Sequence, residues 1–136
     1  MENTGKQFRK RNAVLSCLRQ SKAHPSAEAL YECVRRENPD ISLATVYRNL
    51  TWFKEQGLII SLGTVNGVER FDGCVEPHVH FACRQCGSVM DVPRVEIPDS
   101  ISLATSAALD CRVENAHLML TGICKDCIPA DKEQVG

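Results

Sequence analysis

At 136 residues, the chain is long enough for one or two small domains, each with a limited core. It contains no stretch approaching the roughly 18 apolar residues of a membrane span and no apolar N-terminal leader, so we expect a cytoplasmic protein without a membrane partner. Eight cysteines would suggest disulfides in a secreted chain, but in a reducing cytosol their paired C-x-x-C motifs predict metal binding.

The net charge of −1 hides a division between the two halves of the chain. Residues 1–54 carry ten Lys or Arg against five Asp or Glu, whereas residues 55–136 carry six against twelve. A basic front half predicts a polyanionic partner, and the acidic back half would be a poor one. The alternative is a chance distribution of solvated charges.

The first half predicts three helices. Residues 6–20 carry apolar side chains at helical spacing behind a basic cluster. A second helix begins after Ser26, a favourable N-cap, and buries one face before the break at Asn38-Pro39-Asp40. Ser42 caps a third helix that runs to about Gln56.

A β-hairpin is predicted directly after these helices. Residues 58–62 and 68–71 form two short strands around Asn66-Gly67, a strong hairpin-turn signal. Three helices followed by a hairpin make a winged helix, so we expect a DNA-binding domain over residues 1–72. The alternative is a generic small α+β core with a solvated polar face.

The third helix is expected to read DNA. Its predicted apolar stripe consists of Leu43, Val46, Tyr47, Leu50 and Phe53. The outward residues near its N-terminal half are then Ala44, Thr45, Arg48, Asn49 and Thr51. Small, hydroxylic, Arg and amide side chains are the types that contact base edges and phosphates. Tyr47 is expected to contribute to DNA binding through packing or a phosphate contact.

The second half predicts a small α/β domain over residues 78–136. Its expected elements are strands at 79–82, 88–92 and 118–121 and a helix from about 99 to 109. Such a domain buries little core, so a structural zinc ion and a dimer interface would both stabilise it. Residues 73–77 are the expected hinge, and 128–136 an expected frayed tail.

Four cysteines predict a structural zinc site. Cys83 and Cys86 form one C-x-x-C knuckle, and Cys124 and Cys127 form the other. Each knuckle directs two sulfurs toward one ion, and four thiolates complete a tetrahedron with no open position. The alternatives are two disulfides or an iron–sulfur cluster.

A second set of ligands surrounds the first knuckle. His78 and His80 are alternate residues of one predicted strand, so their imidazoles point to the same face. Asp72 and Asp91 come from the preceding strand end and the partner strand. Mixed nitrogen and oxygen ligands suit Fe²⁺ or Mn²⁺, although they are also compatible with zinc. From spacing alone, His24 is a weak candidate.

With these residues in view, the chain resembles the ferric uptake regulator family of bacterial metal-dependent repressors over roughly residues 8–128. The motifs that carry the resemblance are Ser42-Leu-Ala-Thr-Val-Tyr-Arg-Asn-Leu50, Glu69-Arg-Phe-Asp72, His78-x-His80-x-x-Cys83-x-x-Cys86-Gly87 and Gly122-x-Cys124-x-x-Cys127. The resemblance implies an α+β homodimer with an N-terminal winged helix and a C-terminal dimerisation domain. It also implies repression from a palindromic, AT-rich double-stranded DNA operator.

Within that family, the chain is most similar to the peroxide-sensing branch, whose regulatory site uses three histidines and two aspartates. Carried over by motif, these ligands are His24, Asp72, His78, His80 and Asp91. The resemblance therefore makes His24 a ligand. It further implies that peroxide reacting at bound Fe²⁺ oxidises His24 or His78, so that the metal is lost and repression ends. Mn²⁺ would support DNA binding without peroxide sensitivity.

Some positions depart from the family pattern. Phe8-Arg9-Lys10-Arg11 replaces Thr-x-Gln-Arg, so only Arg11 is expected to keep a DNA contact there. The family's additional histidine site is absent, which leaves His117 as a surface residue. Cys74 keeps a zinc-responsive repressor open as an alternative, beside an iron-responsive one.

Cys17, Cys33 and Cys111 are interpreted as ordinary buried residues. A zinc-dependent hydrolase, with Asp91 as base beside His78 and His80, is the competing class. The basic helix face and the five-ligand shell argue against it, because catalytic zinc keeps three protein ligands and an open position.

Overall fold

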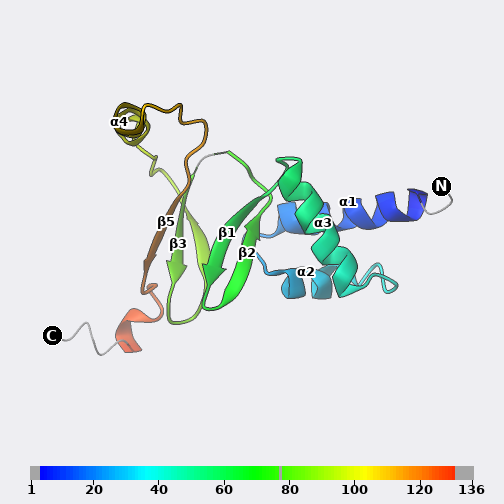
Figure 1. The fold of residues 1–136 in the computed structure, drawn as a ribbon. Helices are drawn as coiled ribbons and strands as arrows, with labels where there is room; N and C mark the ends of the chain where they lie inside the picture. The colour runs from blue at the N-terminus through cyan, green and yellow to red at the C-terminus, as the bar shows by residue number, and fades with distance from the viewer. Residues whose placement is uncertain (1–3, 77, 131–136) are drawn as a thin grey trace. The chain divides into compact units, whose positions relative to one another are not determined.

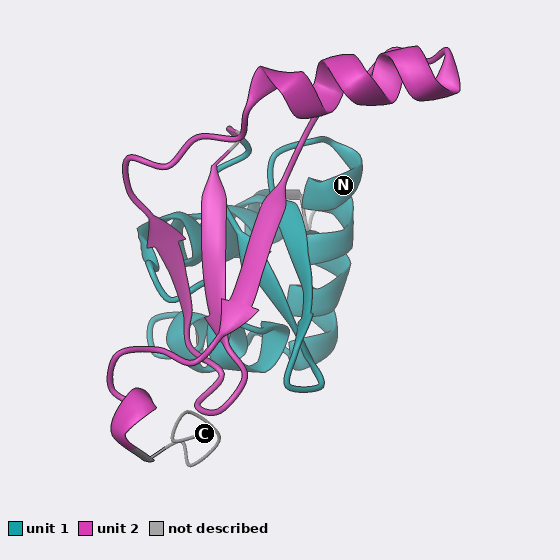
Figure 2. Ribbon diagram, turned by 90° about the vertical axis from the view of Figure 1, so that its left-hand side faces the viewer, with its two compact units in different colours: residues 1–75 teal, residues 76–136 magenta. Residues whose placement is uncertain are grey.

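A computed structural model describes residues 4–76 and 78–130, and the chain forms two compact units, residues 1–75 and 76–136 (Figure 2). The boundary after Val75 falls within the stretch 73–77 that we expected to be a hinge. Pro77 and the tail residues 131–136 lie outside the described residues, so the hinge stays a prediction. Among the described residues, no helix has the length and apolar character that crossing a membrane requires.

The described residues of unit 1, from residue 4 onward, form three helices and a two-stranded antiparallel hairpin (Figure 1). Its elements are α1 (Thr4–Gln20), α2 (Ala27–Val34), α3 (Leu43–Glu55), β1 (Ile60–Val65) and β2 (Val68–Asp72). The hydroxyl oxygens of Ser26 and Ser42 cap α2 and α3 by accepting from the backbone N–H groups of Ala29 and Thr45, both at 3.1 Å. This architecture is the winged helix that the sequence predicts.

One face of each helix packs into a shared core with residues from the hairpin region. The core residues are Val14, Leu18, Ala27, Leu30, Val34, Ile41, Val46, Leu50, Phe53, Ile59 and Phe71. The wing turns at Asn66 (φ 51°) and Gly67 (φ 82°), the pair of left-handed residues that a type I′ turn requires. The Asn-Gly turn signal therefore predicted the hairpin for the correct physical reason.

The burial of α3 corrects two expectations. Val46, Asn49, Leu50 and Phe53 occupy positions i, i+3, i+4 and i+7 and are all buried, whereas Tyr47 is 44% exposed. Asn49, predicted to face outward, thus lies on the core-facing side, and Tyr47, predicted to be in the apolar stripe, lies outside it. A polar residue can occupy this face because its amide has a partner there, as described below.

The described residues of unit 2 form a three-stranded mixed sheet, one α-helix and a short 3₁₀ helix. Its elements are β3 (Val79–Cys83), β4 (Val89–Val92), α4 (Asp99–Leu109), β5 (Leu118–Gly122) and the short 3₁₀ helix η1 (Ile128–Ala130). The central strand β3 pairs antiparallel with β4 and parallel with β5. Residues 128–130 are thus helical, not frayed as expected.

Helix α4 has no buried residue. Its large apolar side chains are open to solvent, with Leu103 71% and Leu109 70% exposed. The helix expected from about residue 99 to 109 is present: it begins after Pro98 and ends at Leu109, and Asp110 is its left-handed C-cap with φ 54°. An exposed apolar helix in so small a unit is typical of a surface that is covered by another molecule.

Candidate metal centres and nucleic-acid interface

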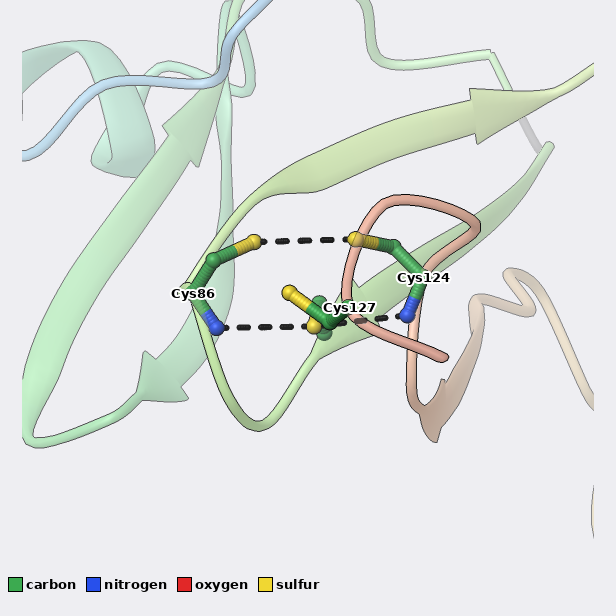
Figure 3. Close-up of side chains that lie close together, drawn as sticks. Cys86, Cys124 and Cys127 are labelled. Carbon is green, nitrogen blue, oxygen red and sulfur yellow. Dashed lines mark hydrogen bonds between the residues drawn. The ribbon is translucent and has the colours of Figure 1, made fainter. Parts of the chain in front are cut away.

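The four cysteines of unit 2 form one cluster. Cys83 ends β3, Cys86 lies in the turn that follows it, and Cys124 and Cys127 follow β5. The four sulfur atoms all lie within 4.8 Å of one another. The sulfurs of Cys86 and Cys124 are 3.8 Å apart (Figure 3). The parallel pairing of Cys83 with Gly122 brings the two knuckles together, although they are far apart in sequence.

Backbone amides are directed at one sulfur of this cluster. The N–H groups of Cys86 and Cys124 donate to Cys83 Sγ at 3.5 and 3.4 Å, and they lower the pKa of that thiol to about 6. The neighbouring Cys124 thiol, together with burial, raises the pKa of Cys127 to about 12. Four adjacent thiolates repel one another, so they are stable together only around a cation. Four sulfurs with amide donors fit tetrahedral zinc.

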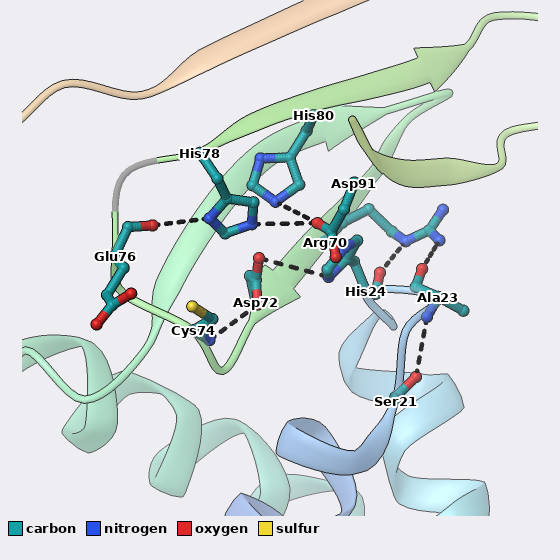
Figure 4. Close-up of polar contacts among 10 residues, drawn as sticks. All are labelled: Ser21, Ala23, His24, Arg70, Asp72, Cys74, Glu76, His78, His80 and Asp91. Atoms are coloured by element: carbon teal, nitrogen blue, oxygen red, sulfur yellow. Dashed lines mark hydrogen bonds and ion pairs between the residues drawn. The ribbon is translucent and has the colours of Figure 1, made fainter. Parts of the chain in front are cut away.

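In unit 1, Arg70 fixes the loop that carries His24. The Arg70 guanidinium donates from Nε to the carbonyl oxygen of His24 and from Nη2 to that of Ala23, the latter at 2.6 Å (Figure 4). The N–H of Phe71 also donates to the Pro25 carbonyl at 3.1 Å. These bonds hold the loop between α1 and α2 against β2, and they hold His24 at φ 51°, a backbone conformation that non-glycine residues rarely adopt.

His24 and Asp72 form a pair within unit 1. Nδ1 of His24 lies 3.6 Å from Oδ2 of Asp72, the last residue of β2. The other carboxylate oxygen, Oδ1, accepts from the backbone N–H of Cys74 at 2.8 Å. Cys74 therefore contacts this carboxylate through its backbone, and its thiol is not part of the cysteine cluster.

His78, His80 and Asp91 form a second group within unit 2. Asp91 on β4 pairs directly with His80 on β3, and His78 lies just before that strand. One oxygen, Asp91 Oδ1, lies 3.1 Å from His78 Nε2 and 3.2 Å from His80 Nε2, and the two ring centroids are 4.1 Å apart (Figure 4). Two imidazole nitrogens thus converge on one carboxylate oxygen, as the strand alternation predicts.

The orientation of His78 suits a metal ligand. Its Nδ1 lies 2.7 Å from the Glu76 carbonyl oxygen, which can only accept, so Nδ1 carries the proton. In the neutral ring, the Nε2 lone pair then faces the Asp91 oxygen. Two lone pairs repel each other unless a cation lies between them, and this cation is either a proton or a metal ion. A backbone carbonyl that fixes the far nitrogen is the usual support of a metal-bound histidine.

A groove of about 800 Å³ lies on unit 1 between α1 and α3. Its lining residues are Lys6, Gln7, Lys10, Arg11, Thr45, Tyr47, Arg48, Asn49, Thr51, Trp52 and Glu55. Of the six residues predicted to contact DNA, five line this groove, while Ala44 is exposed beside them. The predictions omitted Lys6, Lys10 and Trp52, although the basic cluster before residue 12 was a signal for the lysines.

Side-chain contacts order the groove. Arg11 Nε donates to Asn49 Oδ1 at 3.2 Å, and the Arg11 guanidinium lies 4.0 Å from the Trp52 ring centroid. Arg48 donates to the Thr45 hydroxyl at 3.0 Å. These bonds fix the two arginines in place, so that less side-chain entropy is lost when an anion binds.

The remaining cysteines are not the ordinary buried residues that we expected. Cys33 and Cys111 are exposed, and Cys17 is half-buried. Cys17 and Cys33 lie in contact, with their sulfurs 3.2 Å apart. The sequence held no sign of this contact, because it depends on the packing of α1 against α2.

A winged helix followed by an α/β unit with a four-cysteine cluster and His/Asp groups defines a metal-dependent transcriptional regulator. The chain belongs to the ferric uptake regulator family, whose model matches residues 2–121. The resemblance and the α+β fold inferred from the sequence are therefore confirmed, and the hydrolase alternative is wrong.

Similar proteins with assigned roles include peroxide regulators. The chain is 33% identical to the peroxide-responsive repressor PerR of Staphylococcus saprophyticus over 117 residues, which cover 86% of this chain and 78% of that repressor. The crystal structure of the Campylobacter jejuni peroxide stress regulator matches with a TM-score of 0.80 at 29% identity, covering 93% of this chain and 94% of that one. The Vibrio cholerae ferric uptake regulator matches with a TM-score of 0.66 at 27% identity, covering 91% and 100%.

Proposed function

We propose that the chain is a homodimeric repressor that senses peroxide through one regulatory Fe²⁺ or Mn²⁺ ion. The five proposed ligands are His24 and Asp72 of unit 1 and His78, His80 and Asp91 of unit 2. The observation that carries the proposal is that Asp91 Oδ1 lies within 3.2 Å of two imidazole nitrogens in unit 2. A His–Asp pair in unit 1 and the similarity to PerR support it further.

The proposed ligands come from both units, so one ion would link the DNA-binding unit to the dimerisation unit. Such an ion favours the arrangement of the units in which all five ligands can reach it. The free energy by which the ion can favour DNA binding is then limited by the difference between its binding free energies for the linked and unlinked arrangements. The chemistry of the donors, three nitrogens and two carboxylates, suits Fe²⁺ and Mn²⁺.

The proposed sensing step ends with an oxidised histidine. Bound Fe²⁺ would supply the electron that cleaves the O–O bond of peroxide, which Mn²⁺ does not do. In the net reaction, hydrogen peroxide would transfer one oxygen atom to the ring of His24 or His78 in a two-electron oxidation, and its other oxygen would leave as water. An oxidised ring is a poorer ligand, so the ion is released and operator binding is lost.

This function is tested by giving one dose of hydrogen peroxide to the Fe²⁺-loaded and Mn²⁺-loaded full chain. We expect one added oxygen on His24 in tryptic peptide 23–35 or on His78 in peptide 71–84, only with Fe²⁺, and a parallel loss of operator binding. The Cys74→Ser variant, whose mutated residue is in the second peptide, should respond like the parent. Histidines that stay unmodified in the Fe²⁺ form, or a site that binds only zinc, would contradict the assignment.

We infer that the cysteine cluster holds a structural Zn²⁺ ion and that the groove of unit 1 holds a palindromic, AT-rich DNA operator. Arg48, Thr45 and Ala44 on α3 are the candidates for base contacts. Arg11 suits a phosphate contact, with Asn49 as its positioning residue.

The homodimer is proposed to form through unit 2. Leu103 and Leu109 expose more than two-thirds of their surface, and a second copy of this chain would cover them. In such a dimer, the two copies of α3 are related by a two-fold axis, which matches the symmetry of a palindromic operator. Sedimentation of the full chain tests this directly, because a monomer at micromolar concentration would contradict it.

A further inference from the structure

Two cysteines of unit 1 contact each other away from the proposed metal ligands. Cys17 on α1 and Cys33 on α2 have their sulfurs 3.2 Å apart, and both are free thiols. A disulfide bond is about 2.05 Å long, so the sulfurs need to approach by only about 1 Å to be joined. Helices α1 and α2 pack against each other in the same core, so their packing maintains this contact.

The two thiols have different surroundings. Cys33 is exposed, whereas Cys17 is half-buried and packs against the core of unit 1. Burial and the contact with the Cys33 thiol raise the pKa of Cys17 to about 12. Cys17 is therefore held as a thiol at neutral pH, and Cys33 is the sulfur that a dissolved oxidant meets first.

We propose that Cys17 and Cys33 are a redox-active dithiol that a hydroperoxide oxidises to a disulfide without regulatory iron. Cys33 loses its proton and attacks the peroxide as a thiolate. An S–O bond forms and gives a sulfenic acid, while the O–O bond breaks and the departing oxygen takes up that proton and leaves as water or an alcohol. The Cys17 sulfur then displaces the hydroxyl of the sulfenic acid, and that hydroxyl leaves as water with the proton of Cys17. The two thiols lose two electrons, and the two oxygens of the peroxide gain them.

The disulfide would enclose the loop that carries His24. Residues 17 and 33 lie on either side of this loop, which Arg70 already holds against β2. A covalent link between α1 and α2 reduces the conformational freedom of the unfolded chain, so the melting temperature of the oxidised protein should rise. The site is distinct from the proposed iron chemistry, because it uses neither the histidines nor the zinc-cluster cysteines.

Peptide mapping of the full chain tests the proposal. The protein is treated with hydrogen peroxide with and without added Fe²⁺, alkylated, and digested with trypsin without reduction. We expect peptides 12–19 and 23–35 to be joined, with the loss of two hydrogen atoms and in equal yield under both conditions. Dithiothreitol should separate them. Histidine oxidation would instead add an oxygen to peptide 23–35 only with Fe²⁺, so the two reactions are distinguishable.

Matched variants complete the test. Cys17→Ser should leave Cys33 as a sulfenic acid that dimedone traps, and Cys111→Ser, which removes another exposed thiol, should form the disulfide as the parent does. The proposal is overturned if Cys33 is recovered fully alkylated after peroxide treatment. It is equally overturned if Cys33 pairs with a cysteine other than Cys17, or if the link appears only when Fe²⁺ is present.

Discussion

Arg70 and Asp72 lie two residues apart in β2, so the alternation of a strand places their side chains on one face. On that face, Arg70 binds the carbonyl groups of the loop whose His24 side chain faces Asp72. The fork of the guanidinium suits this task because it reaches two carbonyl oxygens at once. Arg70 thus positions a proposed ligand through that ligand's own backbone.

Replacing Arg70 should therefore weaken binding of the regulatory ion. We expect Arg70→Lys to lower Mn²⁺ affinity by about 10–100-fold, as is usual when a supporting contact of a ligand is lost. A lysine keeps the charge but cannot replace both bonds with the same geometry. Mn²⁺ titration measures the effect, and circular dichroism checks that the fold is retained. Parent-like affinity in a folded Arg70→Lys protein would show that the loop needs no such support.

At the scale of single residues, sequence patterns predicted some site residues and could not predict others. His80 and Asp91 follow from strand alternation and pairing, which are local rules. His24 depends on a loop that tertiary hydrogen bonds hold in place, so only family resemblance pointed to it. Cys17 meets Cys33 through the packing of two helices, and no spacing within either helix encodes that contact.

At the scale of elements, the turn after β2 approaches α1 closely. A Cβ atom built at Gly73 would lie 2.8 Å from Arg19 Cγ and 3.2 Å from Arg19 Cα. The latter is a backbone atom of a packed helix, which cannot move away easily. Glycine is required here by space, because no side chain fits between the turn and the helix.

Gly73→Ala should therefore destabilise unit 1 by about 1–3 kcal/mol, the usual range for overpacking. Gly5→Ala is the matched control, since its added Cβ meets nothing within 4 Å and alanine favours the helix. Chemical denaturation measures both changes in the free energy of unfolding. Equal stability of the two variants would mean that the turn can withdraw from α1.

The sheet of unit 2 and its cysteine cluster should be stable only together. We expect Cys124→Ser to lose zinc and to unfold or monomerise the protein, because zinc binding supplies folding free energy on the order of 10 kcal/mol in small domains. Cys111→Ser, an exposed cysteine outside the cluster, should behave as the parent. Zinc analysis and sedimentation velocity measure the two effects. A zinc-free, stable Cys124→Ser dimer would refute the structural role.

Most elements were predictable because local signals agreed with the fold. Serine caps, the Asn-Gly turn and apolar periodicity gave the helices and the hairpin nearly as observed. The predicted buried face of α3 was wrong at two positions. Tyr47 was assigned to the core but is exposed, and Asn49 was expected to face outward but is buried. A buried amide is stable only with a partner, and that partner, Arg11, comes from another helix.

At the scale of the whole molecule, the basic charge belongs to the unit with the groove. Six of the groove residues lie on α1 or in the first half of α3 and carry basic or hydroxyl groups: Lys6, Lys10, Arg11, Thr45, Tyr47 and Arg48. Unit 1 carries eleven Lys or Arg against eight Asp or Glu, and unit 2 carries five against nine, so an approaching DNA duplex is attracted to unit 1 and repelled by unit 2. Charge thus orients the protein before any base is contacted.

Removing one arginine from each unit should reveal this difference. We expect Arg48→Ala to weaken operator binding by about 1–3 kcal/mol if the side chain contacts a base. Arg112→Ala removes the same charge from an exposed site in unit 2 and should change affinity little. Fluorescence anisotropy at several salt concentrations measures both affinities. Equal losses in the two variants would indicate that charge alone, and not the position of Arg48, determines recognition.

The strand order of unit 2 also determines when that unit can fold during translation. Unit 1 precedes unit 2 in the chain, so it emerges from the ribosome before unit 2 and can fold first. The central strand β3, however, pairs on one side with β5, and two of the four cysteines follow β5. The sheet and its cysteine cluster can therefore be completed only after residues 118–127 have been translated. A chain that stops before β5 would carry a complete unit 1 but an incomplete unit 2, so binding of the proposed zinc ion would mark the point at which a newly made chain can form the proposed dimer.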